Sequence, residues 1–345
     1  MTAVSGTGAW PGTDPLEAQV VVLGDLTDVP SEVSGLPFVV HLPQRGPAAT
    51  LTGRALASLV DLPAELGPHG WKLADRGGGD LAHARALLRE DLDALAVAAH
   101  GYVGPLVVPV LGPLSLAADL YLARGDRAVG DAGAVRELAQ SLAAGVAEHL
   151  QAVRRAVPGA VPRVLVHEPL LAQVVAGVLP SFSGYARLRA VRGPVAAEHL
   201  AQVVRAARAA GADHVAVHGG TAWTTIPVVR AAGADGLALH VDALTTQGVE
   251  RVAAAVEAGT TFWAQLPRAT SSQCAGPDVV GQAETLARPW REVGLPVRGL
   301  DDVVLLAGDA DRDADRAGDG GPDDARASLA GIVRAARVLV ERALA

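Results

Sequence analysis

The sequence predicts an α/β protein in which residues 1–345 form a single (β/α)8 barrel, or TIM barrel. Apolar runs of about four to seven residues alternate with longer amphipathic patterns, which is typical of parallel strands covered by helices on both faces. Eight such runs fit a barrel, which usually takes about 250 residues plus insertions. Half of the residues are hydrophobic, enough to bury a large core. A doubly wound open sheet is the alternative that the same alternation allows.

Each apolar run is interpreted as one buried strand. The expected strands are Thr2–Ser5, Pro37–Leu42, Leu106–Leu111, Arg163–His167, His214–His218, Gly236–Val241, Thr261–Leu266 and Val303–Ala307. Because parallel strands of a barrel all end at one mouth, the polar residues that follow these runs are expected to gather there.

The helices between the strands have recognisable ends. Asp14 is placed to cap a helix with Pro15 at its first position and Glu17 three residues after the cap, which is a capping-box pattern. A glycine closes three of the later helices. The other expected helices are Asp80–Ala99, Asp131–Val157, Pro194–Ala210, Thr225–Arg230, Thr245–Ala258, Pro277–Val293 and Asp323–Leu344.

Composition excludes several classes of function. The net charge is −8 and Lys72 is the only lysine, so the clustered cations that nucleic-acid binding needs are missing. Cys274 is the only cysteine, which excludes an intramolecular disulfide and a cysteine-rich zinc module. The N-terminus has no basic region and no apolar run, so we expect no signal peptide and a cytoplasmic protein.

Two segments resemble functional elements that we do not expect here: a membrane span and a calcium-binding loop. Ala94–Ala118 carries no Asp, Glu, Lys or Arg, as in a membrane span, but glycines and prolines interrupt it, so we expect no membrane insertion. An acidic low-complexity stretch, 308–325, contains seven Asp with the alternation of a calcium loop. However, Ala314 stands where that loop needs glycine, and Gly320 where it needs a bidentate glutamate. We expect a solvated loop there.

Four histidines stand at the ends of expected strands: His41, His167, His218 and His240, with Glu168 next to the second. Neutral imidazoles on neighbouring strands are common metal ligands, and a glutamate would add an oxygen donor. The alternative is that each ring packs at the rim of the barrel and bonds to a neighbour.

The two glycines after His218 also allow more than one interpretation. Gly219 and Gly220 would let a ligand approach the backbone closely, or would supply a turn with positive φ. The helix expected near Thr225 would offer free N–H groups to an anion. The chain contains no G-x-S-x-G elbow, no Walker loop and no G-x-G-x-x-G.

A resemblance to a known family rests on five short motifs. They are "SGTGAWPGTDPLEA" near the N-terminus, "LPQRGP" (Leu42–Pro47), "TGR" (Thr52–Arg54), "LVDLP" (Leu59–Pro63) and "HEP" (His167–Pro169). In this order the chain resembles small actinobacterial proteins of the cobalamin-independent methionine synthase family, from Gly6 to about Pro267. These are similar to the C-terminal catalytic barrel of that enzyme and to the uroporphyrinogen decarboxylase-like superfamily. The resemblance implies a barrel that moves a methyl group from a methyltetrahydrofolate to the thiol of homocysteine, which zinc holds as thiolate.

The resemblance also implies where a substrate would bind. It assigns Gly8, Ala9 and Trp10 of the first loop to this role, together with Arg45 and His167. Ala9 stands where the family has serine, and His167 where the family has the aspartate of an Asp-Glu-Pro motif. An aspartate would pair with a substrate ammonium, whereas a histidine supplies no fixed negative charge.

The implied zinc site matches the family only in its histidine. His218 stands where the family has a zinc ligand, and the expectation is that His218 and Glu168 are catalytic and that His218, His240 and Glu168 hold any metal. Gly220 occupies the place of one zinc cysteine, and the last expected strand contains no second one. Cys274 follows the seventh strand and would be the replacement thiolate.

The function predicted from these residues is methyl or alkyl transfer to a thiol. It would use a small-molecule substrate, methyltetrahydrofolate as co-substrate and zinc as cofactor, all by resemblance. We expect no useful methionine synthesis, because both zinc cysteines are missing. Two alternatives stay open. One is a metal-dependent enzyme of other chemistry that uses His167, His218 and His240, and the other is a non-catalytic barrel that binds a small ligand.

Overall fold

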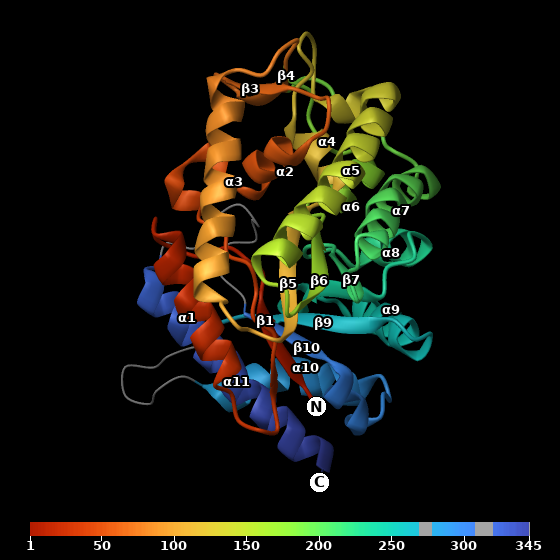
Figure 1. Cartoon of the computed structure of the whole chain (residues 1–345). Coiled ribbons are helices and arrows are strands. Elements are labelled where there is room, and N and C mark those ends of the chain that lie inside the picture. Colours follow the sequence, from red (N-terminus) through yellow and green to blue (C-terminus); the bar gives the residue numbers. More distant parts are fainter. Residues whose placement is uncertain (269–277, 308–319, 345) are drawn as a thin grey trace.

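The computed structural model describes residues 1–268, 278–307 and 320–344, and these form the predicted (β/α)8 barrel (Figure 1). Eight parallel strands make one sheet in the order β2-β1-β10-β9-β8-β7-β6-β5, with helices on its outer side. The strands are β1 (Ala3–Gly6), β2 (Ser34–Gly35), β5 (Gly104–Leu111), β6 (Ala160–His167), β7 (His214–His218), β8 (Gly236–His240), β9 (Thr261–Leu266) and β10 (Val304–Ala307).

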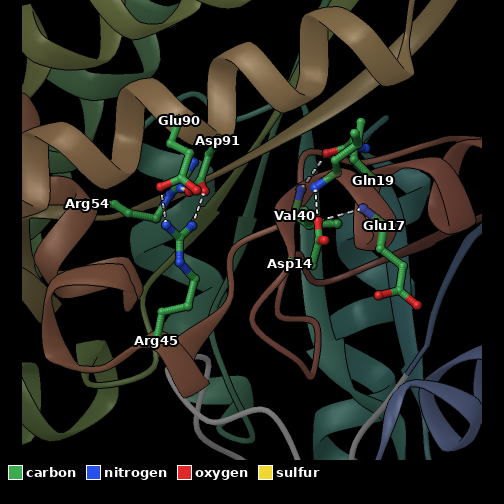
Figure 2. A network of polar contacts seen from close by, with 9 residues as sticks. Asp14, Glu17, Gln19, Val40, Arg45, Arg54, Glu90 and Asp91 are labelled. Carbon is green, nitrogen blue, oxygen red and sulfur yellow. Dashed lines mark hydrogen bonds and ion pairs between the residues drawn. The ribbon is translucent and has the colours of Figure 1, made fainter.

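Seven of the eight expected strands are present. The prediction of a strand at Pro37–Leu42 was wrong, because this segment is not a regular strand. The assigned strand β2 is only Ser34–Gly35, and Phe38 and His41 make isolated bridges to Val107 and Ala9. Gln19 of helix α1 (Pro15–Thr27) explains the interruption. Its buried amide donates to the carbonyl of Phe38 (2.9 Å) and accepts from the N–H of Val40 (3.1 Å), replacing ladder partners (Figure 2).

The irregular segment still joins the two edges of the sheet. On one side the N–H of Leu36 donates to Val4 of β1 (2.8 Å), and the N–H of His41 donates to Gly8 (2.9 Å). On the other side the N–H of Val39 donates to Val107 of β5 (2.9 Å), and Val107 donates back to Pro37 (2.8 Å). Residues 36–41 therefore lie between β1 and β5, in the position of the second strand of the barrel.

Strand register brings the carboxyl ends to one level. Leu111 pairs with His167, and His167 pairs with His218 on the next strand. Further round the barrel, His240 pairs with Gln265. Because the ends of β6, β7, β8 and β9 are adjacent, the polar residues that close these strands share one mouth of the barrel.

The expected helices are all found, with ends that differ by a few residues. Asp14 caps α1 as predicted, accepting from the N–H groups of Leu16 (2.9 Å) and Glu17 (3.0 Å). The others are α3 (Gly79–Ala98), α5 (Ala132–Ala156), α7 (Gly193–Ala209), α8 (Ile226–Ala231), α9 (Thr246–Glu257), α10 (Val279–Glu292) and α11 (Pro322–Leu344). Pro277, the expected start of α10, and residues 308–319 of the acidic stretch lie outside the described residues.

Several short elements were not predicted. They are the helices α2 (Leu51–Ser58), α4 (Pro113–Asp119) and α6 (Leu171–Ala176) and the antiparallel hairpin of β3 (Ala64–Gly67) and β4 (Gly70–Leu73). Elements of four to eight residues show too little periodicity to be recognised from sequence. The uncharged stretch Ala94–Ala118 contains the end of α3, then β5, then α4. Within the described ranges, no helix combines the length and the apolar character needed to cross a bilayer.

Aliphatic side chains from the strands and the surrounding helices form one continuous core, from Ala3 to Leu339. A small set of polar side chains is buried with them at the carboxyl ends of the strands and of the 36–41 segment. These are His41, His167, Glu168, His218, His240 and Gln265. Because burying a polar group without a partner is costly, the partners of these side chains define the candidate site.

Candidate functional site

Four histidines are buried together at this mouth, and we call His41, His167, His218 and His240 the histidine cluster. The rings of His167 and His218 stack with centroids 5.5 Å apart, and the ring of His240 meets His218 edge-on at 5.3 Å. His41 is close enough to disfavour a charge on His167. None of the four side chains is more than 8% exposed. The prediction was that Trp10, Arg45, His167, His218 and His240 converge at one mouth, and it is confirmed for the three histidines.

His218 is held by hydrogen bonds to both of its ring nitrogens. The N–H of Gly220 donates to Nδ1 (3.1 Å), so the ring proton is on Nε2, which donates to Oε1 of Gln265 (2.6 Å). Burial, and next the neighbouring His240, lower the pKa of His218 to about 3. His218 is therefore a neutral ring in a fixed orientation.

The two glycines after His218 serve this orientation. Gly220 has φ +71°, a conformation that side chains rarely adopt, and this turn aims its N–H at the imidazole. Gly219 lies so close to the Thr225 hydroxyl that a Cβ would collide with it. Of the interpretations that the sequence allowed, the positive-φ turn is the one found.

His167 presents an unused acceptor. A hydrogen bond with the backbone of Thr7 raises its pKa, but burial and then the neighbouring His218 and His41 lower it well below the ordinary value. The ring is therefore neutral. Within the described residues its buried Nε2 has no hydrogen-bond partner. With the ring proton directed to Thr7 from Nδ1, Nε2 carries a lone pair inside the histidine cluster.

Glu168 is buried completely, and its two oxygens face helix α4. Oε1 accepts from the N–H of Leu114 (2.9 Å), and Oε2 accepts from the N–H (2.8 Å) and hydroxyl (2.7 Å) of Ser115. Burial raises the pKa of Glu168 to about 7, against the opposing effect of these hydrogen bonds. Gly112 has no Cβ, and any Cβ there would collide with this carboxylate. Glu168 thus fixes the start of α4, while its expected catalytic and metal-binding roles stay predictions.

Arg45 lies in an ion-pair network with helix α3 that is buried at Asp91 and exposed at Glu90 (Figure 2). Its guanidinium donates to Asp91 (2.7 Å) and Glu90 (2.5 Å), and Arg54 also pairs with Asp91. Burial lowers the pKa of Arg54, although Asp91 raises it in part. We call Arg45, Arg54, Glu90 and Asp91 the arginine network. Arg45 is thus engaged with α3, and substrate binding by Arg45 stays a prediction.

The first loop packs against the histidine cluster. Gly8 has φ +106°, and a Cβ there would collide with Pro109. Ala9 bridges to His41, and the N–H of Trp10 donates to the carbonyl of His41 (2.9 Å). Thr7, Ala9 and Trp10 border a small cavity of about 30 Å³. The predicted loop is therefore in place beside the candidate site, but substrate binding by it is untested.

Among the residues that the structure describes, the donors do not fit the implied zinc ion. Within the described ranges, no three or more His, Cys, Asp or Glu side chains are grouped to hold a metal. Both nitrogens of His218 and both oxygens of Glu168 are already engaged. Cys274, the replacement thiolate, lies outside the described residues. Zinc therefore stays a prediction, and no chemical step is derived from it.

Two contributors were not recognised as site residues from the sequence. Gln265 orients His218, and Ser115 holds Glu168. Gln265 did carry a signal, because it falls near the end of an expected strand. Ser115 carried none, because its partner is 53 residues away and helix α4 was not expected.

Comparison with known proteins supports the fold, and it does not assign the chain to a family. No family model and no curated protein matches the sequence. A B12-independent methionine synthase from Shewanella sp. W3-18-1, in complex with selenomethionine, has a TM-score of 0.56 at 11% identity over 99% of this chain and 98% of that one. A native KDPGal structure (0.43, 13% identity, 99% and 97% coverage) and 2,3-dimethylmalate lyase (0.34, 12%, 87% and 74%) follow. Of these three TM-scores, that of the synthase exceeds 0.5. The chain therefore has the same fold as that synthase, a TIM barrel.

Proposed function

We propose that this chain is a barrel enzyme that binds a small thiol at the histidine cluster and transfers a methyl or alkyl group to it. The observation that carries the proposal is the buried lone pair on Nε2 of His167. A thiol S–H would donate a hydrogen bond to this nitrogen, and exclusion of water strengthens such a bond. The sequence motifs and the shared fold favour a thiol over other donors.

The proposed reaction converts a thiol and a methyl donor, CH3–X, into a methyl thioether and HX. His167 accepts the thiol proton, the sulfur forms the new S–C bond, and the bond from carbon to X breaks. The proton then passes to X, so the ring ends neutral. Burial disfavours an imidazolium at His167, but a thiolate beside it would offset that cost by opposite charge.

His218 and His240 would position the reactants, and His218 would do so without supplying charge. His218 is fixed by Gln265 and Gly220 and is kept neutral by burial. A cationic neighbour would repel a proton on His167 and lower its pKa further, so a neutral His218 suits a ring that must accept a proton. In this proposal the imidazole takes the part that a cysteine-bound zinc ion has in the family that the sequence resembles.

The test supplies homocysteine, cysteine and other small thiols with a polyglutamylated methyltetrahydrofolate, and detects the thioether by mass spectrometry. We expect turnover of at least one thiol that persists after treatment with a chelator. His167→Ala should lower it by about a hundredfold or more, the usual contribution of a positioned proton acceptor. His214→Ala is the matched control, since His214 is at the opposite end of the same strand as His218.

The outcomes separate the alternatives. Unchanged turnover in His167→Ala, or a strict requirement for zinc, would contradict the proposal. Thiol binding without turnover would favour the non-catalytic barrel. Homocysteine should be a poor acceptor, because His167 replaces a fixed negative charge. Losing such a charge-assisted bond costs about 1.5–3 kcal/mol, roughly tenfold or more in affinity. Sustained methionine formation that His218→Ala abolishes would show this expectation to be wrong.

A further inference from the structure

A second cavity opens on the loops that follow the 36–41 segment and strand β5. It is a groove of about 490 Å³ between the loop at 43–52, the β3–β4 hairpin and the chain after α4. Its lining includes Pro43, Pro47, Thr52, Trp71, Tyr121 and Arg127. Two sequence motifs that the histidine cluster does not use, "LPQRGP" and "TGR", contribute to this wall. Helix α3 secures them through the arginine network.

Two aromatic side chains line this groove, and a third lies against one of them. The whole chain has only three Phe, three Tyr and five Trp, yet Trp71 and Tyr121 both line it. Phe182 meets the ring of Tyr121 edge-on at 5.9 Å and the ring of His69, another lining residue, at 5.0 Å. Phe182 is 56% exposed. Trp71 is buried, so the exposed ring is that of Phe182, next to the groove and in contact with two of its lining residues. In so aromatic-poor a chain this exposed ring points to a planar ring as the ligand.

A cationic side chain that can bind an anion, Arg127, also lines this groove. The guanidinium of Arg127 lies over the ring of Tyr121, with its carbon 5.7 Å from the ring centroid. Its Nη1 donates to the carbonyl of Ala118 (2.8 Å). That bond uses one of five N–H donors, and it fixes the planar group so that others remain for a carboxylate.

A neighbouring carboxylate limits the charge of the ligand. Asp119 also lines the groove, and its Oδ2 accepts from the hydroxyl of Thr52 (3.1 Å). A ligand with several negative groups would place one near Asp119 and be repelled. The net charge of −8 on the chain acts in the same direction. The groove therefore favours a single negative charge.

We propose that this groove binds a planar aromatic carboxylate, with its ring against Tyr121 and Phe182 and its carboxylate on Arg127. The site shares no residue with the histidine cluster. It does not depend on the thiol chemistry proposed above, and either proposal is able to fail alone.

The test is a calorimetric titration of the wild-type protein with 1-naphthoate. Two matched probes separate the contributions: 1-naphthalenemethanol keeps the ring without the charge, and cyclohexanecarboxylate keeps the charge without the aromatic ring. We expect 1-naphthoate to bind about tenfold or more tightly than either, as a charge-assisted hydrogen bond added to ring stacking implies. No binding of 1-naphthoate by the wild type, or equal binding of the three probes, would overturn the proposal.

Variants locate the site. Arg127→Gln should weaken 1-naphthoate about tenfold and leave 1-naphthalenemethanol unchanged, whereas Arg124→Gln removes the same charge from an exposed position in the same loop and should change neither. Phe182→Ala alters an exposed ring with little risk to folding and should weaken both aromatic probes. Tyr185→Ala, 98% exposed, is its control. Wild-type affinity for 1-naphthoate in both Arg127→Gln and Phe182→Ala would place the ligand elsewhere and refute the site.

Discussion

The histidine cluster and the arginine network bury polar groups in opposite ways. The cluster holds four buried imidazoles, and burial keeps at least two of them, His167 and His218, uncharged, as their lowered pKa values indicate. The network instead keeps its charges and pairs them. Asp91, with a side chain 3% exposed, stands between Arg45 and Arg54, whose side chains are 10% and 7% exposed.

Because of this difference, different changes should destabilise the two regions. A neutral cluster loses stability when protons are forced on it, and it can bind a ligand because a lone pair is free to be used. A paired network loses stability when one partner is removed, because the other charge is then left buried. The first arrangement suits a binding site and the second suits a support for loops.

The largest effect should come from breaking the network at its centre. Asp91→Ala leaves two buried guanidinium groups without their shared carboxylate. We expect a loss of about 3–5 kcal/mol in the free energy of unfolding, measured by urea denaturation. A loss below about 1 kcal/mol would mean that water already screens this pair, and the contrast between the two regions would then disappear.

A smaller effect should follow from acid, and it should arise at the cluster. The folded pKa of His218, about 3, lies below the unfolded value of about 6.5. Its contribution to stability is therefore complete above pH 6.5 and falls as the pH falls toward 3. At pH 5 the loss from this one ring is about 2 kcal/mol. His167, whose pKa is also lowered, adds to it.

The control for acid sensitivity must allow for Glu168, which acts in the opposite direction. Its pKa is raised to about 7, so its contribution is present below the unfolded value and is lost as the pH rises through 7. The difference between wild type and His218→Gln cancels this term. Unfolding free energies that change equally with pH in both proteins would contradict the assignment to His218.

The sequence predicted the parts of the fold that depend on local patterns. The bounds of β7 and β9 were predicted to the residue, because each is a short apolar run between polar, glycine or proline residues. The cap at Asp14 was found from its spacing to Pro15 and Glu17. The placing of three histidines at one mouth followed from the parallel strands alone.

The remainder depends on partners that are distant in the chain. Gln19 replaces ladder bonds of Val40, 21 residues later, so a run that looks like a strand is not one. Arg45 is engaged by Asp91 across 46 residues, and Glu168 by Ser115 across 53. Hydrophobic periodicity reports which side chains are buried, but it does not report which polar group each will meet.

A third prediction concerns the turn that orients the cluster. Gly220→Ala forces a side chain into φ +71°, and we expect a loss of about 1 kcal/mol in the free energy of unfolding. Gly233→Ala is the matched control, since Gly233 has φ +75° and open space around it. Only Gly220→Ala should also change the NMR signals of the His218 ring. Equal spectra in both variants would mean that the turn does not orient this histidine.

The smallest effect is expected at the rim of the arginine network, and it sharpens the contrast with its centre. Glu90 also accepts a hydrogen bond from Arg45 (2.5 Å), but its side chain is 58% exposed. An exposed pair gains little from its charge, because water and salt screen it and because two long side chains lose freedom in forming it. Glu90→Ala should therefore lower the free energy of unfolding by only about 0.5 kcal/mol, and less at 1 M salt. The same measurement on Asp91→Ala should show a loss that salt hardly changes, because that pair is shielded from solvent. If Glu90→Ala costs as much as Asp91→Ala, then the carboxylates act as one unit, and the stability of the network does not follow burial.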